Sequence, residues 1–445
     1  MSSPRAGGTQ RKRRHVSDPD ELRWASLPED LLGAVASRLL AGGDNLLDYV
    51  RFRAVCASWR SGTASPRGRG VADQRFHPRR WMMLPEGHGL YPGRPELGGH
   101  VRFLNLDTGT LVRPRIPLLG GHCAIDSVDG LLLLLPWDPI LQDDAPVRLL
   151  HPFIGDVLEL APLATLLPQL DSRQLSSLGP YKITRLTMVV CASASFNAAG
   201  AMTIMLALHQ LSRVAFATSL DRQWTLSSWR CPPMSCSPVS FQGKLYTMHS
   251  DRSSWGKEMH QVFQIDPPVL LQDAESPAAA LQQPKLIATI PADKAVHPLG
   301  LVECASELLL LGQNHLGESQ ILVCKLADLV LQRFTPVKSI GGNTLFMKGR
   351  KISVSSKVLP TVKGDTVVHW CSAEPPYLAQ YDLSSGNFSP AIDNCSLYGD
   401  VPGPSNLVHH MFSCCVRYQW ARGLLFRGNT PMHQLIGSCS MKEQL

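Results

Sequence analysis

Apolar residues near the start of the chain recur at the spacing of an α-helix. Five of them form one stripe: Leu27, Leu31, Leu32, Val35 and Leu39. The glycine-bearing stretch at 41–45 interrupts this pattern, and a second apolar face follows over residues 47–59. The pattern predicts short helices that pack into a small all-α domain, whose bounds we place at residues 23 and 66.

From about residue 81 onward the pattern becomes that of β-strands. Short runs rich in Val, Ile and Leu alternate with turn signals such as Asp129-Gly130, FQGKLY, MKGRKI and LSSGNF. Many short strands over about 340 residues fit a sandwich, a barrel or a β-propeller, and blades of roughly 40–50 residues would number about six to eight. We predict a large all-β domain over residues 77–420, with a propeller as the preferred architecture. Residues 421–445 fit this pattern poorly and stay unassigned.

The net charge of the chain is concentrated at its N-terminal end. Residues 1–80 hold 15 Lys or Arg and 8 Asp or Glu, which accounts for the whole formal charge of +7, because the remaining residues hold 28 of each sign. A neutral body has no bulk attraction for a phosphate backbone, which argues against nucleic-acid binding. Residues 1–22 are polar and without periodicity, so we expect a disordered tail.

The tail contains a run of basic residues: Arg11, Lys12, Arg13 and Arg14. Such a run is typical of a nuclear import signal, and a solvated basic tail explains it equally well. The N-terminus lacks an apolar signal stretch and the 12 cysteines follow no disulfide spacing. We therefore expect a protein of the nucleus or cytoplasm with free thiols. The longest apolar run, Leu131–Pro136, is far shorter than the ~20 residues of a membrane span.

The helical segment resembles an F-box. The motifs LPEDLL and VCASWR carry the match through these residues: Leu27, Pro28, Asp30, Leu31, Leu32, Val35, Leu39, Phe52, Arg53, Val55, Cys56, Trp59 and Arg60. The resemblance implies that this segment docks on a Skp-type adaptor, which links it to a cullin scaffold. The residues expected to bind the adaptor are Leu27, Pro28, Leu31, Leu32, Val35, Leu39, Val55, Cys56, Trp59 and Arg60. Each of them could instead pack inside a self-contained helical hairpin.

The rest of the chain resembles a large plant group that joins an N-terminal F-box to a C-terminal domain of formerly unknown function, similar to kelch-like β-propellers. The stretches HPRRWMMLPEG, DSVDGLLLL, VRLLHPFIGDVLEL, SVSSK and YLAQYDLSSG carry this second match. Together the two resemblances imply a substrate-recognition subunit of a Skp–cullin–F-box ubiquitin ligase, which is not itself an enzyme. The β domain would then bind a client protein, which the sequence does not identify.

Residue types that could support other chemistry are sparse. Cys231 and Cys236 lack a second pair at zinc spacing, and a strand would place only one His and one Cys of the cluster around His409 and Cys414 on each face. No convergent catalytic set and no phosphate-binding loop is present, so we expect no metal and no cofactor. One alternative stays open, in which the propeller senses a ligand or is an enzyme and the F-box controls only turnover.

Overall fold

The computed structural model describes most of the chain between Trp24 and Cys415. The described residues are 24, 26–41, 46–84, 100–136, 144–180, 182–187, 189–197, 200–232, 234, 236–252, 258–268, 281–290, 296–314, 320–359, 361–371, 377–391 and 407–415. The basic run at 11–14 and the segment at 421–445 lie outside them. No helix among the described residues is long and apolar enough to cross a membrane.

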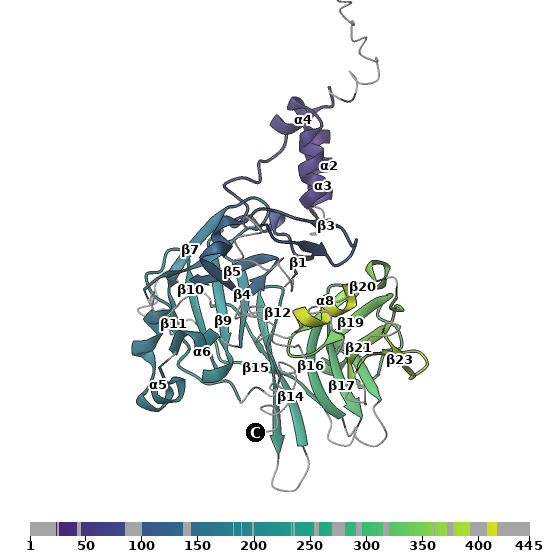
Figure 1. The fold of residues 1–445 in the computed structure, drawn as a ribbon. Helices are drawn as coiled ribbons and strands as arrows, with labels where there is room; N and C mark the ends of the chain where they lie inside the picture. The colour runs from purple at the N-terminus through teal and green to yellow at the C-terminus, as the bar shows by residue number, and fades with distance from the viewer. Residues whose placement is uncertain are drawn as a thin grey trace, which may run out of the picture.

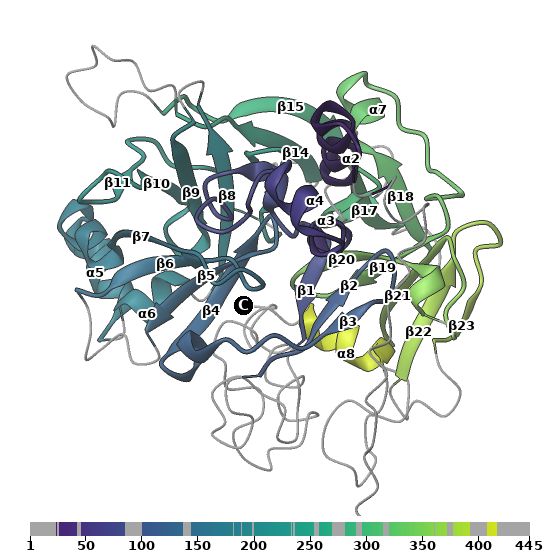
Figure 2. The ribbon, with the colours of Figure 1, turned by 90° about the horizontal axis from the view of Figure 1, so that it is seen from above.

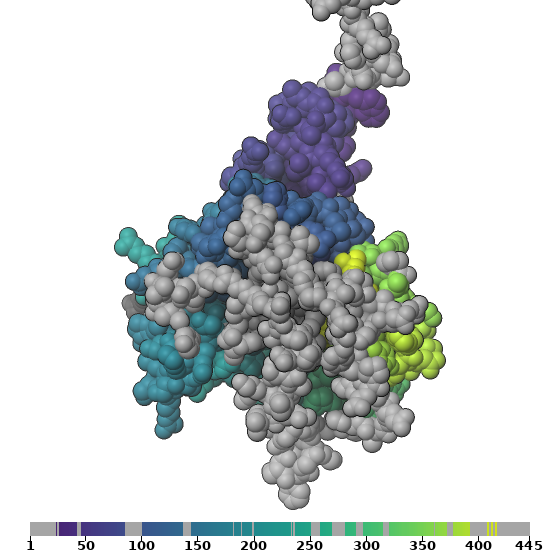
Figure 3. Space-filling model, viewed as in Figure 1, coloured from purple at the N-terminus to yellow at the C-terminus, as the bar shows by residue number. Residues whose placement is uncertain are grey.

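Three helices form a unit at the N-terminal end, which we call the helical unit: α2 (Glu29–Ala41), α3 (Leu46–Ala54) and α4 (Ala57–Ser61). Its core is small and consists of Ala36, Leu40, Leu46, Tyr49 and, from beyond the helices, Phe76. The helices predicted from the apolar periodicity are therefore confirmed. Figures 1 and 3 show the helical unit projecting from one face of the β domain.

In the described part of the chain the strands form six sheets, so the β domain is a six-bladed propeller. Figure 2 shows the sheets arranged in a ring. The first sheet contains β1 (Trp81–Met83), β2 (Phe103–Asn105) and β3 (Leu111–Val112), and the second contains β4 (His122–Val128), β5 (Leu131–Pro136), β6 (Pro146–Leu150) and β7 (Val157–Pro162). The third contains β8 (Val190–Phe196), β9 (Met202–Leu208), β10 (Arg213–Thr218) and β11 (Thr225–Leu226), and the fourth contains β12 (Val239–Phe241), β13 (Lys244–Arg252), β14 (Glu258–Ile265) and β15 (Lys285–Ile290). The fifth contains β16 (Val296–Cys304), β17 (Glu307–Asn314) and β18 (Ile321–Lys325), and the last contains β19 (Asn343–Met347), β20 (Lys351–Ser355), β21 (Thr366–Cys371), β22 (Tyr377–Asp382) and β23 (Phe388–Pro390).

Neighbouring strands in each sheet run antiparallel, as expected of hairpins, with β19 and β21 as a parallel exception. Two predicted turns have the positive φ angles that tight hairpins require. Asp129 and Gly130 have φ of 51° and 82°, and Gln242 and Gly243 have φ of 50° and 75°. The Asp-Gly and FQGKLY turns are therefore confirmed as the connections β4–β5 and β12–β13.

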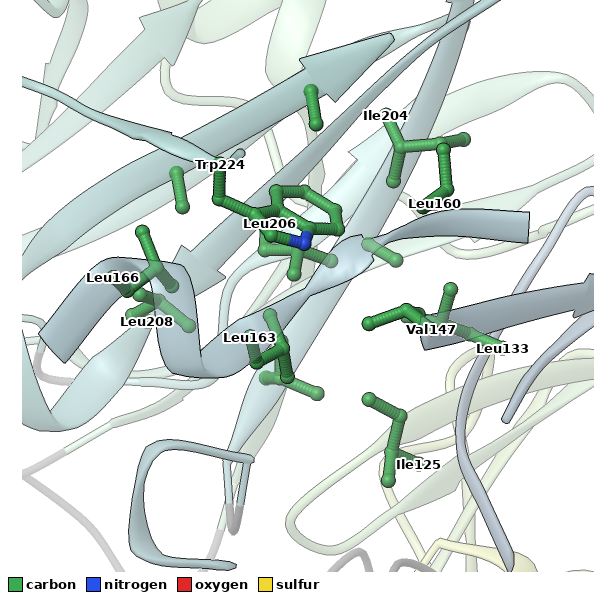
Figure 4. Close-up of a cluster of buried hydrophobic side chains, with 14 of the residues drawn as sticks. Ile125, Leu133, Val147, Leu160, Leu163, Leu166, Ile204, Leu206, Leu208 and Trp224 are labelled. Atoms are coloured by element: carbon green, nitrogen blue, oxygen red, sulfur yellow. The ribbon is translucent and has the colours of Figure 1, made fainter. Parts of the chain in front are cut away.

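Apolar side chains fill the spaces between successive blades. The largest core joins the second and third sheets, and Figure 4 shows Trp224 at its centre, surrounded by leucines of both sheets. Trp224 is fully buried, and its Nε1 donates to the carbonyl of Ala161 at 2.7 Å. Helices α5 (Ser172–Leu178) and α6 (Lys182–Thr187), with a 3₁₀ turn at Leu163–Gln169, lie between these two sheets along the chain.

The first and last sheets meet without exchanging a strand among the described residues. Their shared core contains Leu84 and Leu104 from the first sheet's side and Phe346 from the last. Helix α8 (Leu407–Cys414) contributes Met411, Phe412 and Cys415 near its end to the same core. The strand considered for His409 and Cys414 is therefore wrong, because this segment forms a helix. Helix α7 (Leu326–Val330) packs on the fourth and fifth sheets.

Candidate functional site

The predicted adaptor-binding residues fall into three groups by exposure. Five are exposed: Pro28, Leu31, Val35, Val55 and Arg60. Four are partly buried: Leu27, Leu39, Cys56 and Trp59. Among the exposed apolar side chains, Leu31 is 50%, Val35 42% and Val55 61% accessible. Apolar side chains this open, close together in a unit of three helices, give the helical unit an unpartnered hydrophobic surface.

Leu32 has a different position from the rest of this set. It is only 1% exposed, and a Cβ added at Gly62 would lie 3.2 Å from its Cδ1 atom. Leu32 therefore packs inside the helical unit, because position 32 of α2 points towards the end of α4 and not towards solvent. For Leu32 the structure therefore favours the alternative to adaptor binding, namely packing inside the helical unit.

Trp59 and Cys56 have contacts that hold the helical unit together. The Trp59 ring lies 4.5 Å from that of Phe52 between centroids, and its Nε1 donates to the carbonyl of Trp24 at 2.9 Å. The Cys56 Sγ accepts from the backbone N–H of Trp59 at 3.4 Å and caps α4. These side chains shape the unit, and only part of each is accessible.

Residues 62–80, which we call the connector, join the helical unit to the propeller through hydrogen bonds at both ends. At the helical end, the hydroxyl of Tyr49 donates to the Ala64 carbonyl at 2.6 Å, and the guanidinium of Arg53 donates to the same oxygen at 2.8 Å. Near the middle of the connector, the backbone N–H of Gly70 donates to the carboxylate of Asp156 of the propeller at 2.8 Å. The connector is therefore fixed at its helical end and near its middle.

His151, between β6 and β7, anchors the connector near its propeller end. Its Nε2 lies 2.9 Å from the carbonyl oxygen of Phe76 in a 3₁₀ turn at Gln74–Phe76. Burial lowers the pKa of His151 to about 4, so the ring is neutral near pH 7. The neighbouring His77 is also buried, and its Nδ1 lies 3.5 Å from Asp129.

The innermost strand of every blade contributes to a channel of about 520 Å³ along the propeller axis. Residues from the connector close one side of its mouth, namely Gln74, Arg79 and Arg80. Deeper in the channel, the buried carboxylate of Asp126 accepts from the backbone N–H of Ala192 at 2.7 Å and lies 3.6 Å from Arg350. Asp126 thus links three blades across the channel.

Charged side chains at the mouth are unevenly paired. Arg80 binds Asp107 in bidentate fashion, with N–O distances of 2.9 and 2.7 Å. Arg79 lies 3.9 Å from Asp129. Glu303, near the end of β16, has no hydrogen-bond or ion-pair partner among the described residues. The Glu303 side chain is exposed to the channel, but the surrounding protein displaces part of its water and so raises the pKa of its carboxylate. The positive charge of Arg80 acts in the opposite direction and lowers this pKa.

The mouth was not found by sequence reasoning, although one signal was present. Glu303 lies in LGLVECASELLLLG, where it is a charged residue within an apolar run. On an innermost propeller strand such a position faces the channel. The residues that complete the mouth, Arg79 and Asp129, come from distant parts of the chain, and only ring closure brings them together.

The other predicted or rejected sites take ordinary structural positions. Cys231 is buried in the core between the third and fourth blades, and burial raises its thiol pKa to about 12. Cys414 at the end of α8 and Cys415 directly after it are buried, and burial raises the pKa of Cys415 to about 12. In the described part of the chain no three His, Cys, Asp or Glu side chains gather closely enough to hold a metal.

Comparison with known proteins gives one family. The model described as KIB1-4 beta-propeller matches residues 103–382, from the start of β2 to the end of β22, and does not extend to the helical unit. No curated protein matches the chain. Among solved structures, a Mycobacterium tuberculosis puromycin-hydrolyzing peptidase is 12% identical over 74% of this chain with a TM-score of 0.27, and the chain spans 54% of that peptidase's length. A likeness this low carries no argument about function.

Proposed function

The chain belongs to the KIB1-4 β-propeller family, and from this premise we propose that it is the substrate-recognition subunit of a Skp–cullin–F-box ubiquitin ligase. In this proposal the helical unit is an F-box that binds a Skp-type adaptor and, through it, a cullin scaffold. The propeller binds the client protein. The family membership supports the second role, because propellers present loops and a channel mouth on which partners dock.

The exposed apolar surface of the helical unit carries the first role. Leu31 and Val35 lie one helical turn apart on α2, and both are at least 42% exposed. Anchors at i and i+4 are the spacing by which helices insert into apolar grooves. A three-helix unit with so small a core leaves this face open unless a partner covers it. A Skp-type adaptor is the partner that the LPEDLL and VCASWR motifs predict.

The proposed activity needs no reacting group on this chain. A client held by the propeller and a ligase held by the helical unit would be joined by a short connector that is hydrogen-bonded near both ends. The client would then meet the charged ubiquitin carrier at a raised effective concentration. A short connection favours this transfer because it confines the client to one region of space.

A binding experiment with purified adaptor tests the proposal. Full-length protein is compared with a Leu31→Ala/Val35→Ala variant and with a control, Leu220→Ala/Leu331→Ala, which removes apolar side chains that are 83% and 60% exposed on the propeller. We expect the wild type and the control to bind alike and the helical variant to bind at least about tenfold more weakly. Equal binding by all three, or none by the wild type, would overturn the proposal.

The channel supports a second candidate function, in which the propeller senses a small molecule and the helical unit controls only turnover. A cavity of about 520 Å³ is in the size range of small-molecule sites. Thermal stabilisation by a member of a metabolite panel, retained in the Leu31→Ala/Val35→Ala variant, would favour this candidate. Absence of any stabilising compound together with adaptor binding would favour the ligase role.

A further inference from the structure

The mouth of the propeller channel faces the helical unit. Gln74, Arg79 and Arg80 of the connector line the channel beside Asp129 and Glu303. Figure 2, viewed from the side of the helical unit, shows β1, β4 and β8 around the centre of the ring of sheets. A partner bound at the mouth would therefore lie on the same face of the propeller as the helical unit.

At the mouth, Glu303 forms no hydrogen bond or ion pair with another described residue, and Arg80 and Arg79 act on its charge only from a longer distance. Arg80 is occupied by Asp107, with N–O distances of 2.7 and 2.9 Å. Arg79 lies beside Asp129, which also has His77 within 3.5 Å. Glu303 has no such contact among the described residues, although it lies where protein displaces part of its water. A carboxylate in that position gains from a cation that brings its own hydrogen-bond donors.

We propose that the channel mouth binds a segment of the client protein through one basic side chain, Lys or Arg, whose charged group pairs with Glu303. This inference rests on the proposed function, since it names the chemistry of the client that the propeller would recognise. The backbone of the segment lies across the mouth, and its basic side chain enters the channel. Gln242 and Ser306, on the rim, supply neutral hydrogen-bonding groups for the rest of the segment.

The chemistry of the walls favours a protein segment over a small amine. Small-molecule sites are lined mainly by apolar and aromatic side chains that enclose the ligand. The lining of this channel is mixed instead: apolar side chains such as Trp81, Met83 and Phe241 lie beside charged side chains and beside Gln74, Ser240, Gln242 and Ser306. Polar groups spread around an opening suit an extended backbone, which carries a donor and an acceptor at each residue.

Selection from a display library of random 12-residue peptides tests the inference with the full-length protein. We expect the wild type to enrich one position in Lys or Arg. Glu303→Gln should abolish that enrichment, because it keeps the shape of the side chain and removes its charge. The matched control is Glu307→Gln, four residues further along the same hairpin, where the carboxylate pairs with Lys325 at 2.8 Å on the outside. The control should select the same peptides as the wild type.

A selected peptide is then synthesised and its affinity measured by fluorescence anisotropy. Glu303→Gln should weaken binding by about tenfold or more, which is the scale of a charge-assisted hydrogen bond. Replacing the basic residue of the peptide by Gln should have the same effect on the wild type and little further effect on Glu303→Gln. Failure to enrich a basic position, or affinities of wild type and Glu303→Gln within about twofold, would overturn the proposal.

Two further outcomes separate this inference from its alternatives. Stabilisation of the wild type by arginine methyl ester, with no peptide selected, would identify a small-amine site and overturn the peptide proposal. Adaptor binding by Glu303→Gln should equal that of the wild type, because the mouth and the helical surface are separate. If no basic peptide is selected but the adaptor still binds, only the peptide site is overturned and the ligase proposal stands. If the basic peptide is selected but the adaptor does not bind, only the ligase proposal is overturned.

Discussion

The Nε2 atom of His151 lies 2.9 Å from the carbonyl oxygen of Phe76, and the opposite ring nitrogen faces two donors. The backbone N–H groups of Phe153 and Ile154 lie 3.2 and 3.3 Å from Nδ1. This arrangement requires a neutral ring with its hydrogen on Nε2, which then donates to Phe76. The second blade thus holds the connector through one uncharged imidazole.

Acid should weaken the fold through this ring. Burial lowers the pKa of His151 to about 4, against ~6.5 in an unfolded chain. Between these values the unfolded chain binds a proton that the folded chain does not, so the contribution of His151 to stability is complete above about pH 6.5 and falls as the pH drops towards 4. At pH 5 the loss is about 2 kcal/mol.

Denaturant unfolding of wild type and His151→Gln at about pH 7.5 and about pH 5 measures this effect. Because the variant lacks the titrating group, the difference in unfolding free energy between the two proteins should shrink by about 2 kcal/mol at the lower pH. A difference that does not change with pH would contradict the assignment of the acid effect to His151.

Gly130→Ala should displace the connector. A Cβ at this position would lie 1.8 Å from the carbonyl oxygen of Pro78, at a φ of +82°. We expect a loss of at least about 2 kcal/mol of unfolding free energy, from the strained backbone and the clash together. Gly120→Ala is the matched control, because nothing lies within 4 Å of its added Cβ. Equal thermal midpoints for the two variants would contradict this prediction.

Adjacent leucines on α2 should respond differently to truncation. Leu32→Ala removes a side chain that is 1% exposed and should destabilise the helical unit by about 2–5 kcal/mol. Leu31→Ala removes one that is 50% exposed and should change stability by less than about 0.5 kcal/mol. Amide hydrogen exchange in α2 distinguishes the two, with faster exchange expected only for Leu32→Ala.

Trp224→Phe should loosen the interface between the second and third blades. The substitution leaves the carbonyl of Ala161 without the donor that lies 2.7 Å away and opens space in a fully buried site. The combined cost should be about 2–4 kcal/mol. Phe216→Leu, also a fully buried aromatic of the third sheet, retains all hydrogen bonds and should cost less. Denaturant unfolding of both variants measures this, and Trp224→Phe should have the lower unfolding midpoint.

Local sequence patterns predicted the elements that depend only on residues close together in the chain, namely a helix and a hairpin turn. The stripe through Leu27 and Leu39 gave the helix, and Asp129-Gly130 gave the hairpin turn, since each depends on residues close together in the chain. The exposed positions of Leu31 and Val35 agree with the adaptor-binding surface that the F-box resemblance implies, and the stripe alone did not predict them. The inward position of Leu32 did not follow from the stripe either, because it depends on how α4 returns against α2.

The channel mouth depends on long-range closure, so no local pattern contained it. Arg79 and Glu303 are more than 200 positions apart in the sequence, and they become neighbours only when the ring is complete. The helical conformation of α8 was missed for a related reason. Its residues Met411 and Phe412 are apolar enough for either a strand or a helix, and the seam between the first and last blades decides between them.

That seam has a consequence for synthesis of the protein. Its core unites Leu84 and Leu104 with Phe346 and Phe412, so it cannot form until more than 400 residues have left the ribosome. Until then the first blade has an uncovered apolar flank beside an incomplete ring. Exposed flanks of this kind promote aggregation of nascent chains, and late contacts between distant segments fold slowly. The protein should therefore depend on chaperones during translation, until α8 emerges and completes the seam.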